Sequence, residues 1–233
     1  MADLPLLILR PQPGADQTAA RAKEMGLAPV IAPLFAAEAL PWDAPDPARY
    51  DALLLTSANA LRHGGRQLSA YQHLPAFVVG EKTAAMARAR GFAVAAVSAT
   101  GLDDLLPELA KRRQARVLRL AGENHIMLAE RDDLPRIDLV TVYRAAAQPL
   151  AQEAIAVLSA ENVTLLHSAR AAATLVSEME RCALSRKHTH IIAISAATVA
   201  AARHGWASIS SAAEPTDLAL LASASRLCRG VSQ

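Results

Sequence analysis

The segments YDALLLTSAN at residues 50–59 and NVTLLHSAR at residues 162–170 share one plan: an apolar run leads into a hydroxyl residue and then into a stretch with helical spacing. The two copies stay in step along the chain, because Thr83 follows the serine of the first by 26 residues and Thr198 follows that of the second by 30. Each threonine opens an alanine-rich run that ends near a glycine, where a left-handed helix end is easily formed. The repeat indicates two equivalent α/β units.

Short apolar runs alternate with helical stretches over the whole chain. Most of these runs are continuously apolar, which is typical of strands buried on both faces of a parallel sheet. We expect strands at Leu6–Leu9, Pro29–Pro33, Ala52–Leu55, Ala76–Val79, Ala93–Val97, Arg116–Leu120, Leu139–Tyr143, Val163–Leu166, His190–Ile194 and Ser208–Ser210. We expect helices at Gln17–Met25, Thr83–Arg90, Leu102–Arg113, Ala169–Cys182, Ala196–His204 and Asp217–Cys228. This alternation predicts right-handed crossovers and doubly wound parallel sheets.

The second unit lacks a first strand and helix of its own, whereas the chain begins with such a pair at residues 6–25. We therefore expect residues 1–35 and 148–233 to form one discontinuous α/β domain. The first complete unit, at residues 40–141, is then a second α/β domain inserted into it.

Two linker strands, near residues 35–40 and 141–148, are expected to join these domains. The proline-rich stretch Pro41–Pro47 fits the first of the two crossings. A double crossing restrains twist but permits hinge motion, so we expect a cleft that opens and closes.

The composition is that of a globular protein, since 52% of the 233 residues are hydrophobic and 20% are charged. The 24 basic and 22 acidic residues nearly cancel, and no basic stripe typical of nucleic-acid binding is present. No apolar run approaches the roughly 18–20 residues that span a bilayer, and the opening residues lack the basic segment of a signal peptide. We expect a cytoplasmic protein with no nucleic-acid or membrane partner.

Several common catalytic and metal motifs are missing from the sequence. It contains no Gly-x-Gly-x-x-Gly after the first strand, no Walker loop and no Gly-x-Ser-x-Gly elbow. Cys182 and Cys228 are too few for a disulfide framework. The closest histidine pair, His188 and His190, has no acidic or cysteine partner nearby in the sequence, so a solvated turn is favoured over a metal site.

Hydroxyl and glycine residues gather where the expected strands run into helices: Thr56, Ser57, Gly80, Thr83, Ser168, Ser195 and Thr198. In open α/β sheets, ligands bind beyond the carboxyl ends of the strands, where helix N-termini present unpaired N–H groups. One interpretation is therefore a site for an anionic ligand, a carboxylate or phosphate. The other is that the hydroxyls only cap the helices by accepting hydrogen bonds from those same amides.

Five further residues have two interpretations each: Arg10, Asn59, Gly122, Tyr143 and Arg170. Arg10 follows the first strand and either grips a carboxylate bidentately or is a surface charge. Asn59 and Arg170 lie two residues beyond the repeated serines, at the cleft mouth or on an exposed helical turn. Gly122 permits either close backbone approach or a plain turn, and Tyr143 is either a cleft residue or a buried hinge residue.

Taken in order, these motifs resemble the uroporphyrinogen-III synthase family over essentially the whole chain. The residues that carry the resemblance are Arg10-Pro11 at a strand end, Thr56-Ser57-x-Asn59, Gly80-x-x-Thr83, Val142-Tyr143, Ser168 and Thr198. The resemblance implies two flavodoxin-like domains with doubly wound parallel sheets, the first domain discontinuous, joined by a two-stranded linker. This agrees with the layout inferred from the repeat.

The resemblance also implies an enzyme, a cyclising lyase that forms uroporphyrinogen III from hydroxymethylbilane in tetrapyrrole and haem biosynthesis. In this family, loss of the terminal hydroxyl gives an electrophilic azafulvene. Ring D attacks through its substituted position to form a spiro-pyrrolenine, and cleavage and re-addition invert ring D and close the macrocycle. The implied partner is this linear tetrapyrrole with eight carboxylates. No metal or organic cofactor is expected, and the expected state is a monomer.

Tyr143 matches the family's linker tyrosine, which implies a general acid that helps the hydroxyl to depart. The residues that match the family's cleft positions are Thr56, Ser57, Thr83, Ser168 and Thr198, and the expected substrate-binding set adds Arg10, Asn59, Gly80, Gly122 and Ser195. The chain departs from the family where Ser195 replaces a usual glycine, and where Gly122-Glu-Asn-His125 lacks a usual basic residue.

Two other classes of protein remain open at this point. The first is a two-domain binding protein that closes on a small anionic ligand. Such a protein would have the same paired domains and double crossing. The second is a nucleotide-dependent transferase, which the missing phosphate loop disfavours.

Overall fold

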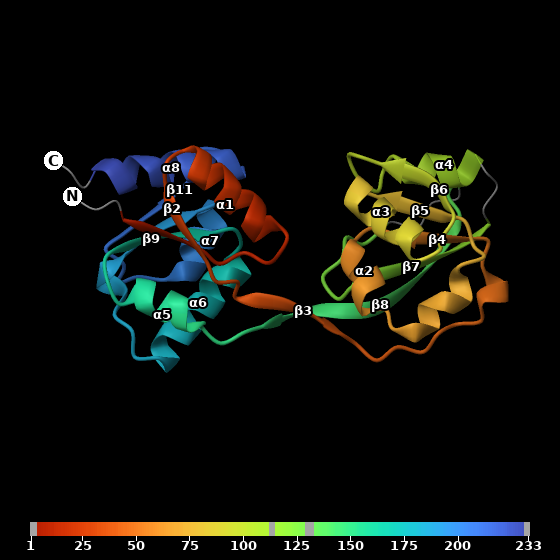
Figure 1. The fold of residues 1–233 in the computed structure, drawn as a ribbon, viewed down its shortest axis with the longest axis horizontal. Helices are drawn as coiled ribbons and strands as arrows, with labels where there is room; N and C mark the ends of the chain where they lie inside the picture. Colours follow the sequence, from red (N-terminus) through yellow and green to blue (C-terminus); the bar gives the residue numbers. More distant parts are fainter. Residues whose placement is uncertain (1–3, 112–114, 129–132, 231–233) are drawn as a thin grey trace. The chain divides into compact units, whose positions relative to one another are not determined.

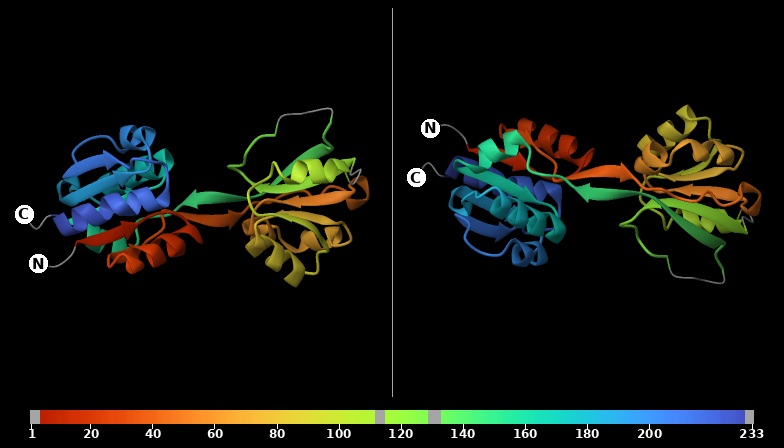
Figure 2. Two further views of the ribbon diagram at one scale, coloured as in Figure 1. Left: turned by 90° about the horizontal axis from the view of Figure 1, so that it is seen from above. Right: turned by 90° about the horizontal axis from the view of Figure 1, so that it is seen from below.

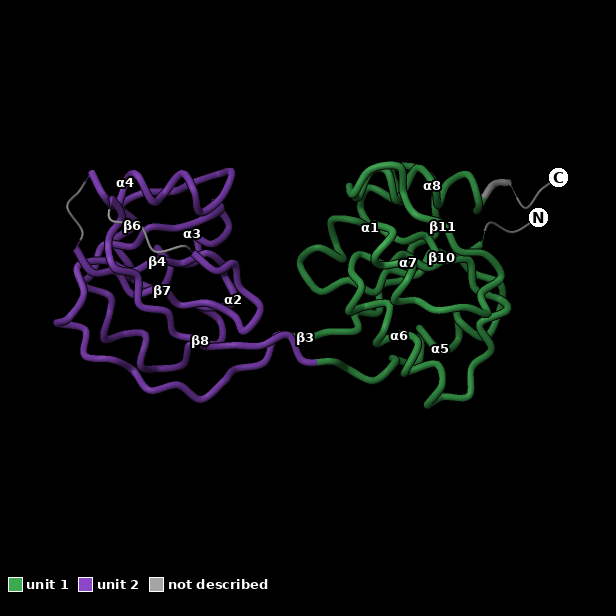
Figure 3. The backbone as a smooth tube through the Cα atoms, turned by 180° about the vertical axis from the view of Figure 1, so that it is seen from behind, with its two compact units in different colours: residues 1–36, 147–233 green, residues 37–146 purple. Residues whose placement is uncertain are grey.

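The computed structural model describes residues 4–111, 115–128 and 133–230. The chain forms two compact units, Met1–Ala36 with Ala147–Gln233 (unit 1) and Ala37–Ala146 (unit 2), shown in Figure 3. We propose that these units are the two domains expected from the sequence, the first discontinuous and the second inserted into it.

Unit 1 is built on a sheet with the strand order β11-β10-β9-β1-β2 (Figure 1). Its strands are β1 (Pro5–Ile8), β2 (Ala28–Ile31), β9 (Asn162–Leu166), β10 (Thr189–Ala193) and β11 (Ser208–Ser211). Its helices are α1 (Gly14–Glu24), α5 (Gln152–Leu158), α6 (Ala169–Arg181), the 3-10 turn η3 (Arg186–His188), α7 (Ala196–Ala202) and α8 (Asp217–Gly230).

All the pairings in this sheet are parallel, and Leu7 on β1 lies opposite both Val30 on β2 and Thr164 on β9. The chain moves outward from β1 to β2 in one direction and from β9 to β11 in the other. The order is that of a flavodoxin-like sheet, and its direction reverses between β1 and β9.

Both faces of the sheet in unit 1 are covered. Leu6 and Ile8 pack with α1 and α8 on one face, whereas the fully buried Leu7 points to the other, where α5 contacts β1 and α6 contacts β9. Figure 1 shows α1 and α8 on one side of the strands and α5 and α6 on the other. This double covering explains why the strands are continuously apolar.

Unit 2 contains a sheet with the strand order β3-β8-β7-β4-β5-β6. Its strands are β3 (Phe35–Ala39), β4 (Ala52–Leu55), β5 (Ala76–Val79), β6 (Val94–Ser98), β7 (Arg116–Gly122) and β8 (Arg136–Ala147). Its helices are η1 (Pro47–Arg49), α2 (Ala58–His63), η2 (Arg66–Tyr71), α3 (Glu81–Ala89) and α4 (Leu105–Lys111). The direction of the chain through this sheet reverses between β4 and β7.

Alternate residues of β4 pack into two different hydrophobic cores of unit 2, one on each face of the sheet. Leu53 and Leu55 pack against buried residues of α2 and α3, whereas Leu54 packs with the leucines of α4 on the opposite face. The strands β4, β5, β6, β7 and β8 pair in parallel. Figure 2 shows that β3 and β8, the segments in which the chain passes between the units, run in opposite directions.

The predicted fold class, an α/β protein with doubly wound parallel sheets, is confirmed. The prediction missed α5, whose seven residues are too few to show a clear helical period. The predicted start of α1, Gln17, is three residues too late, because the helix begins at Gly14 directly after a proline. Within the described residues, no helix is both long enough and apolar enough to cross a membrane.

We expect the substitution Leu54→Ala to lower the free energy of unfolding by about 2–5 kcal/mol, because it leaves a cavity between β4 and α4. Leu54 is 0% exposed, and urea unfolding measures the change. The control is Leu218→Ala, since Leu218 is 65% exposed and should cost less than about 0.5 kcal/mol. Equal costs for the two variants would contradict this packing.

Candidate functional site

The residues singled out in the sequence lie at one edge of each sheet, because parallel strands end on the same side. In unit 1, Arg10, Ser168 and Ser195 follow the carboxyl ends of β1, β9 and β10. In unit 2, Ser57, Gly80 and Gly122 lie at the ends of β4, β5 and β7. The edge of each unit includes its reversal point, where α/β proteins bind ligands.

Three of the serines are helix N-caps. The Ser57 hydroxyl oxygen accepts a hydrogen bond from the backbone N–H of Asn59 at 3.2 Å, at the start of α2. Ser168 accepts from Ala171 N at 3.1 Å at the start of α6. Ser195 accepts from Thr198 N at 3.4 Å at the start of α7. The capping interpretation therefore describes these hydroxyls, while the first N–H groups of the helices still face outward.

Thr83 and Thr198 turn inward, with exposed fractions of 6% and 1%. Their backbone N–H groups donate to the carbonyl oxygens of Gly80 and Ser195, both at 3.0 Å. The Thr198 hydroxyl lies 3.1 Å from that of Ser195. Both threonines therefore stabilise the first helical turn from the core side, and the outward-facing N–H groups are those of the residues before them.

The two repeats differ in the residue that precedes this turn. Gly80 has φ +84°, a conformation that side chains rarely adopt, and its N–H donates to the Ser98 carbonyl oxygen at 2.8 Å. Ser195 has φ −159°, which is extended backbone open to any residue. A serine therefore fits at position 195 without backbone strain, although the resemblance led us to expect glycine there.

Asn59 and Arg170 both lie on the first turn of a helix. Asn59 Oδ1 accepts a hydrogen bond from Arg62 at 3.0 Å, and the Arg170 guanidinium lies over the Phe35 ring, 4.5 Å from its centroid. Asn59 is partly exposed and Arg170 is exposed. Neither contact prevents these side chains from meeting a ligand at the edge of their own unit.

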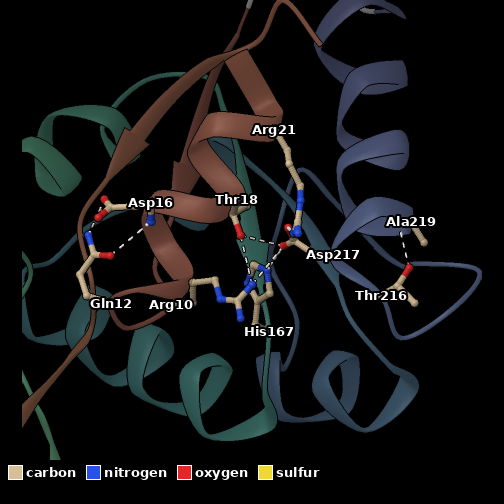
Figure 4. Close-up of polar contacts among 9 residues, drawn as sticks. All are labelled: Arg10, Gln12, Asp16, Thr18, Arg21, His167, Thr216, Asp217 and Ala219. Carbon is tan, nitrogen blue, oxygen red and sulfur yellow. Dashed lines mark hydrogen bonds and ion pairs between the residues drawn. The ribbon is translucent and has the colours of Figure 1, made fainter. Parts of the chain in front are cut away.

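Arg10 belongs to a polar cluster centred on Asp217, the first residue of α8 (Figure 4). The Asp217 carboxylate accepts hydrogen bonds from Thr18 at 2.7 Å, Arg21 at 2.7 Å and Arg10 at 3.2 Å. His167 Nε2 lies 2.9 Å from the same carboxylate. This cluster joins the ends of β1 and β9 to α1 and α8. The cluster holds two guanidinium groups against one carboxylate, so it has one more positive than negative group.

Burial disfavours the charged forms of both Asp217 and His167. It raises the pKa of Asp217, but hydrogen bonds from His167, Thr18 and Arg21 outweigh it and hold this pKa below its usual range. Burial lowers the pKa of His167 below its usual value, against the effect of Asp217. His167 is therefore neutral at pH 7, and its buried Nδ1 has no hydrogen-bond partner among the described residues.

In unit 2, Tyr143 lies against Gly122 at the end of β7. The two residues are register partners on adjacent strands, and the Tyr143 ring is tilted against that of His63 at a centroid distance of 6.2 Å. His125 Nδ1 is 2.9 Å from the Gly122 carbonyl oxygen. The Tyr143 side chain is partly exposed.

The sequence prediction missed Arg119, which lies three residues before Gly122. Arg119 is 4% exposed, and its Nη1 donates to the Ile126 carbonyl oxygen at 2.8 Å. Burial lowers the pKa of this guanidinium, and its Nε has no acceptor in the described part of the chain. Arg119, within β7, therefore holds the loop that follows this strand through the Ile126 carbonyl oxygen. A charged residue within an apolar run was the available signal.

No group of three or more potential metal ligands occurs within residues 4–111, 115–128 and 133–230. Of the histidine pair considered in the sequence, His190 lies 2.8 Å from the Ser208 hydroxyl through Nδ1 and 3.4 Å from Glu161 through Nε2. These contacts bind β10 to β11 and to the start of β9. They are side-chain contacts within unit 1 that need no metal ion.

Comparison with known proteins gives a family match and several structural neighbours. The family model described as uroporphyrinogen-III synthase HemD matches residues 16–222. The uroporphyrinogen-III synthetase of Helicobacter pylori has a TM-score of 0.56 and 17% identity, over 97% of this chain and 100% of that one. The Thermus thermophilus enzyme has a TM-score of 0.43 and 18% identity, over 98% and 100%. A search of curated proteins gave no match.

We expect Asp217→Asn to lower the free energy of unfolding at pH 7 by about 1–3 kcal/mol, because a charged acceptor is removed from four donors. In the wild type, stability conferred by the lowered Asp217 pKa is complete above about pH 4 and is lost as the pH falls through the folded-state value. The neutral His167 adds a loss that begins below about pH 6.5.

Urea unfolding between pH 7 and pH 3 measures both effects. The loss below about pH 4 should be smaller in Asp217→Asn than in the wild type. The control is Asp16→Asn, which changes an exposed carboxylate on α1 and should alter stability by less than about 0.5 kcal/mol. Identical pH profiles for wild type and Asp217→Asn would contradict the role of this carboxylate.

Proposed function

The chain belongs to the uroporphyrinogen-III synthase family, and from this premise we propose how its two sheet edges carry out the family's reaction. The protein is the lyase that cyclises hydroxymethylbilane to uroporphyrinogen III in haem biosynthesis. The non-catalytic alternative, a two-domain protein that only binds a small anion, is not favoured. The match of the family model over residues 16–222 carries this conclusion.

The chemistry of the substrate explains the kind of site that this chain presents. Hydroxymethylbilane is a flexible chain with eight carboxylates, and it closes without inversion of ring D when left alone. The enzyme's main task is therefore to hold it in one geometry, which is a problem of positioning. Backbone N–H groups at helix starts suit carboxylates, because they combine free donors with the positive end of the helix dipole.

In unit 2, we assign carboxylate binding to the start of α3 and to the turn that precedes α2. Gly80 takes a left-handed conformation, which turns the chain so that the first N–H groups of α3 face out from the sheet edge. Thr83 holds this turn from inside, while Thr56 and Ser57 form the neighbouring turn and Asn59 offers an amide side chain. Glu81 and Lys82 in this first turn are exposed.

In unit 1, the corresponding groups lie at the starts of α6 and α7. The exposed Ser168 and the partly exposed Ser195 fix these helix ends, and Thr198 stabilises the second from the core side. Arg10 adds a charged donor. Its hydrogen bonds to Asp217 and Thr18 both use Nη1, and its side chain remains 30% exposed. A substrate carboxylate at this edge gains a charge-assisted hydrogen bond of about 1.5–3 kcal/mol.

Tyr143 is proposed as the general acid. Its hydroxyl makes no hydrogen bond within the described residues, so it is available to a substrate group. As the C–O bond of the hydroxymethyl group breaks, the phenol O–H protonates the departing oxygen and water leaves. The pyrrole nitrogen lone pair forms a C=N bond while the ring C=C electrons shift to form the exocyclic C=CH2 bond. The resulting cation gives its N–H proton back to the phenolate, which leaves the neutral azafulvene and restores the phenol. The sequence predicts that Gly122 binds substrate, and its close approach to the Tyr143 ring supports a place for it beside the proposed acid.

The remaining proposals concern the state of the protein in the cell. We propose a monomer that acts in the cytoplasm without a nucleic-acid partner. The near balance of basic and acidic residues, with a net charge of +2, supports the last point. Gel filtration with light scattering measures the oligomeric state directly.

The activity is tested by product analysis. Freshly generated hydroxymethylbilane is incubated with and without the protein, and the type I and type III uroporphyrins are separated by chromatography after oxidation. The expected result is a change from type I alone to predominantly type III. Only type I product from folded protein would overturn the assignment.

We expect Tyr143→Phe to slow turnover by about tenfold to a hundredfold while some type III product still forms, because a general acid assists a step that is otherwise slow. Initial rates of type III formation measure this. The matched control is Tyr50→Phe. Tyr50 lies just before the start of β4, and its hydroxyl donates to Asp138 at 3.1 Å. The rate of this variant should equal that of the wild type. Unchanged kinetics for Tyr143→Phe would remove Tyr143 from the mechanism.

A further inference from the structure

The contact between Gly122 and Tyr143 is closer than any other residue at position 122 would permit. A Cβ atom placed on Gly122 would lie 2.6 Å from Cζ of Tyr143, 2.7 Å from Cε2 and 2.9 Å from the hydroxyl oxygen. Real Cβ atoms essentially never approach heavy atoms this closely. The atoms in the way are the hydroxyl end of the ring, so the group that a methyl would displace is the one proposed to donate the proton.

The backbone around this contact is fixed on both strands. The register between β7 and β8 shifts between Ala121 and Gly122, and this shift brings Tyr143 opposite Gly122. The Glu123 N–H then donates to the Tyr143 carbonyl oxygen at 2.9 Å, while the Gly122 carbonyl oxygen lies 2.9 Å from His125 Nδ1. These bonds restrain the two backbones, so an added methyl can be accommodated only by moving the ring.

The ring also has a neighbour on α2. The ring of His63 lies 6.2 Å from that of Tyr143. Tyr143 packs against the core that α2 and α3 share with the sheet, and its neighbour Val142 belongs to this core. The Tyr143 ring therefore lies between Gly122 on one side and His63 and this core on the other. A ring displaced from Gly122 loses this position.

We propose that Gly122 is a positioning residue for the reaction: its lack of a side chain sets where the Tyr143 hydroxyl lies. The inference rests on the proposed function of Tyr143, and it differs from the assignment of Gly122 to direct substrate contact. Positioning through Tyr143 predicts a loss of kcat, whereas loss of a substrate contact predicts a rise in KM.

The kinetic test compares Gly122→Ala, Tyr143→Phe and the double variant. We expect Gly122→Ala to lower kcat by about the same factor as Tyr143→Phe, about tenfold to a hundredfold, with KM changed less than twofold. The double variant should be no slower than Tyr143→Phe alone, because both changes remove the same hydroxyl from its position. A loss in the double variant equal to the product of the single losses would overturn the proposal, as would a normal kcat in Gly122→Ala.

The matched control for the kinetics is Gly101→Ala. It is the same substitution in the same unit, but nothing lies within 4 Å of an added Cβ at Gly101. We expect its kcat and KM to equal those of the wild type. Equal losses of kcat in Gly101→Ala and Gly122→Ala would overturn the proposal, because the loss would then not depend on Tyr143.

A second test uses thermal unfolding and needs no activity. Gly122→Ala should lower Tm by about 3–8 °C through overpacking against the ring. In the Tyr143→Ala background, where the ring is absent, the same substitution should lower Tm by less than about 1 °C. An equal loss of Tm in both backgrounds would refute the contact. If wild-type protein formed only the type I product while this cycle gave the expected result, the contact would stand and the proposed function would fall.

Discussion

The two parallel sheets are buried on both faces, and this constraint determines where polar chemistry can occur. A strand such as β4 has leucines on both sides and no face that water reaches. Polar side chains that must meet a ligand are therefore found where the strands end, beside the first N–H groups of the helices that follow. The polar residues singled out in the sequence lie at these edges for that reason.

The two units organise their edges differently. In unit 1, Asp217 gathers Arg10, Arg21 and His167, so that charged groups order the ends of β1 and β9. In unit 2, the corresponding reversal point has no such carboxylate among the described contacts, and an aromatic ring rests on a glycine instead. The first arrangement places two guanidinium groups against one carboxylate, and the second places a phenol beside a bare backbone.

Much of this arrangement follows from local sequence. The apolar runs that end in Ser57 and Ser168 predict strands that lead into capped helices, and the structure has both caps. The missing parts depend on contacts between distant residues. His167 and Asp217 are 50 residues apart, and no local pattern joins them. The contact of Tyr143 with Gly122 arises from a register shift between β7 and β8, which the sequence does not encode as a motif.

The central claim is that helix starts at the carboxyl edges of both sheets hold the carboxylates of a tetrapyrrole. The most direct measurement is a titration of the isotopically labelled protein with uroporphyrin III, a stable octacarboxylate, followed by the chemical shifts of the backbone amides. Shifts concentrated at residues 57–59, 80–83, 168–171 and 195–198 are the predicted result. Shifts concentrated instead at the amino ends of β4, β5, β9 and β10, with these helix starts unchanged, would contradict the account.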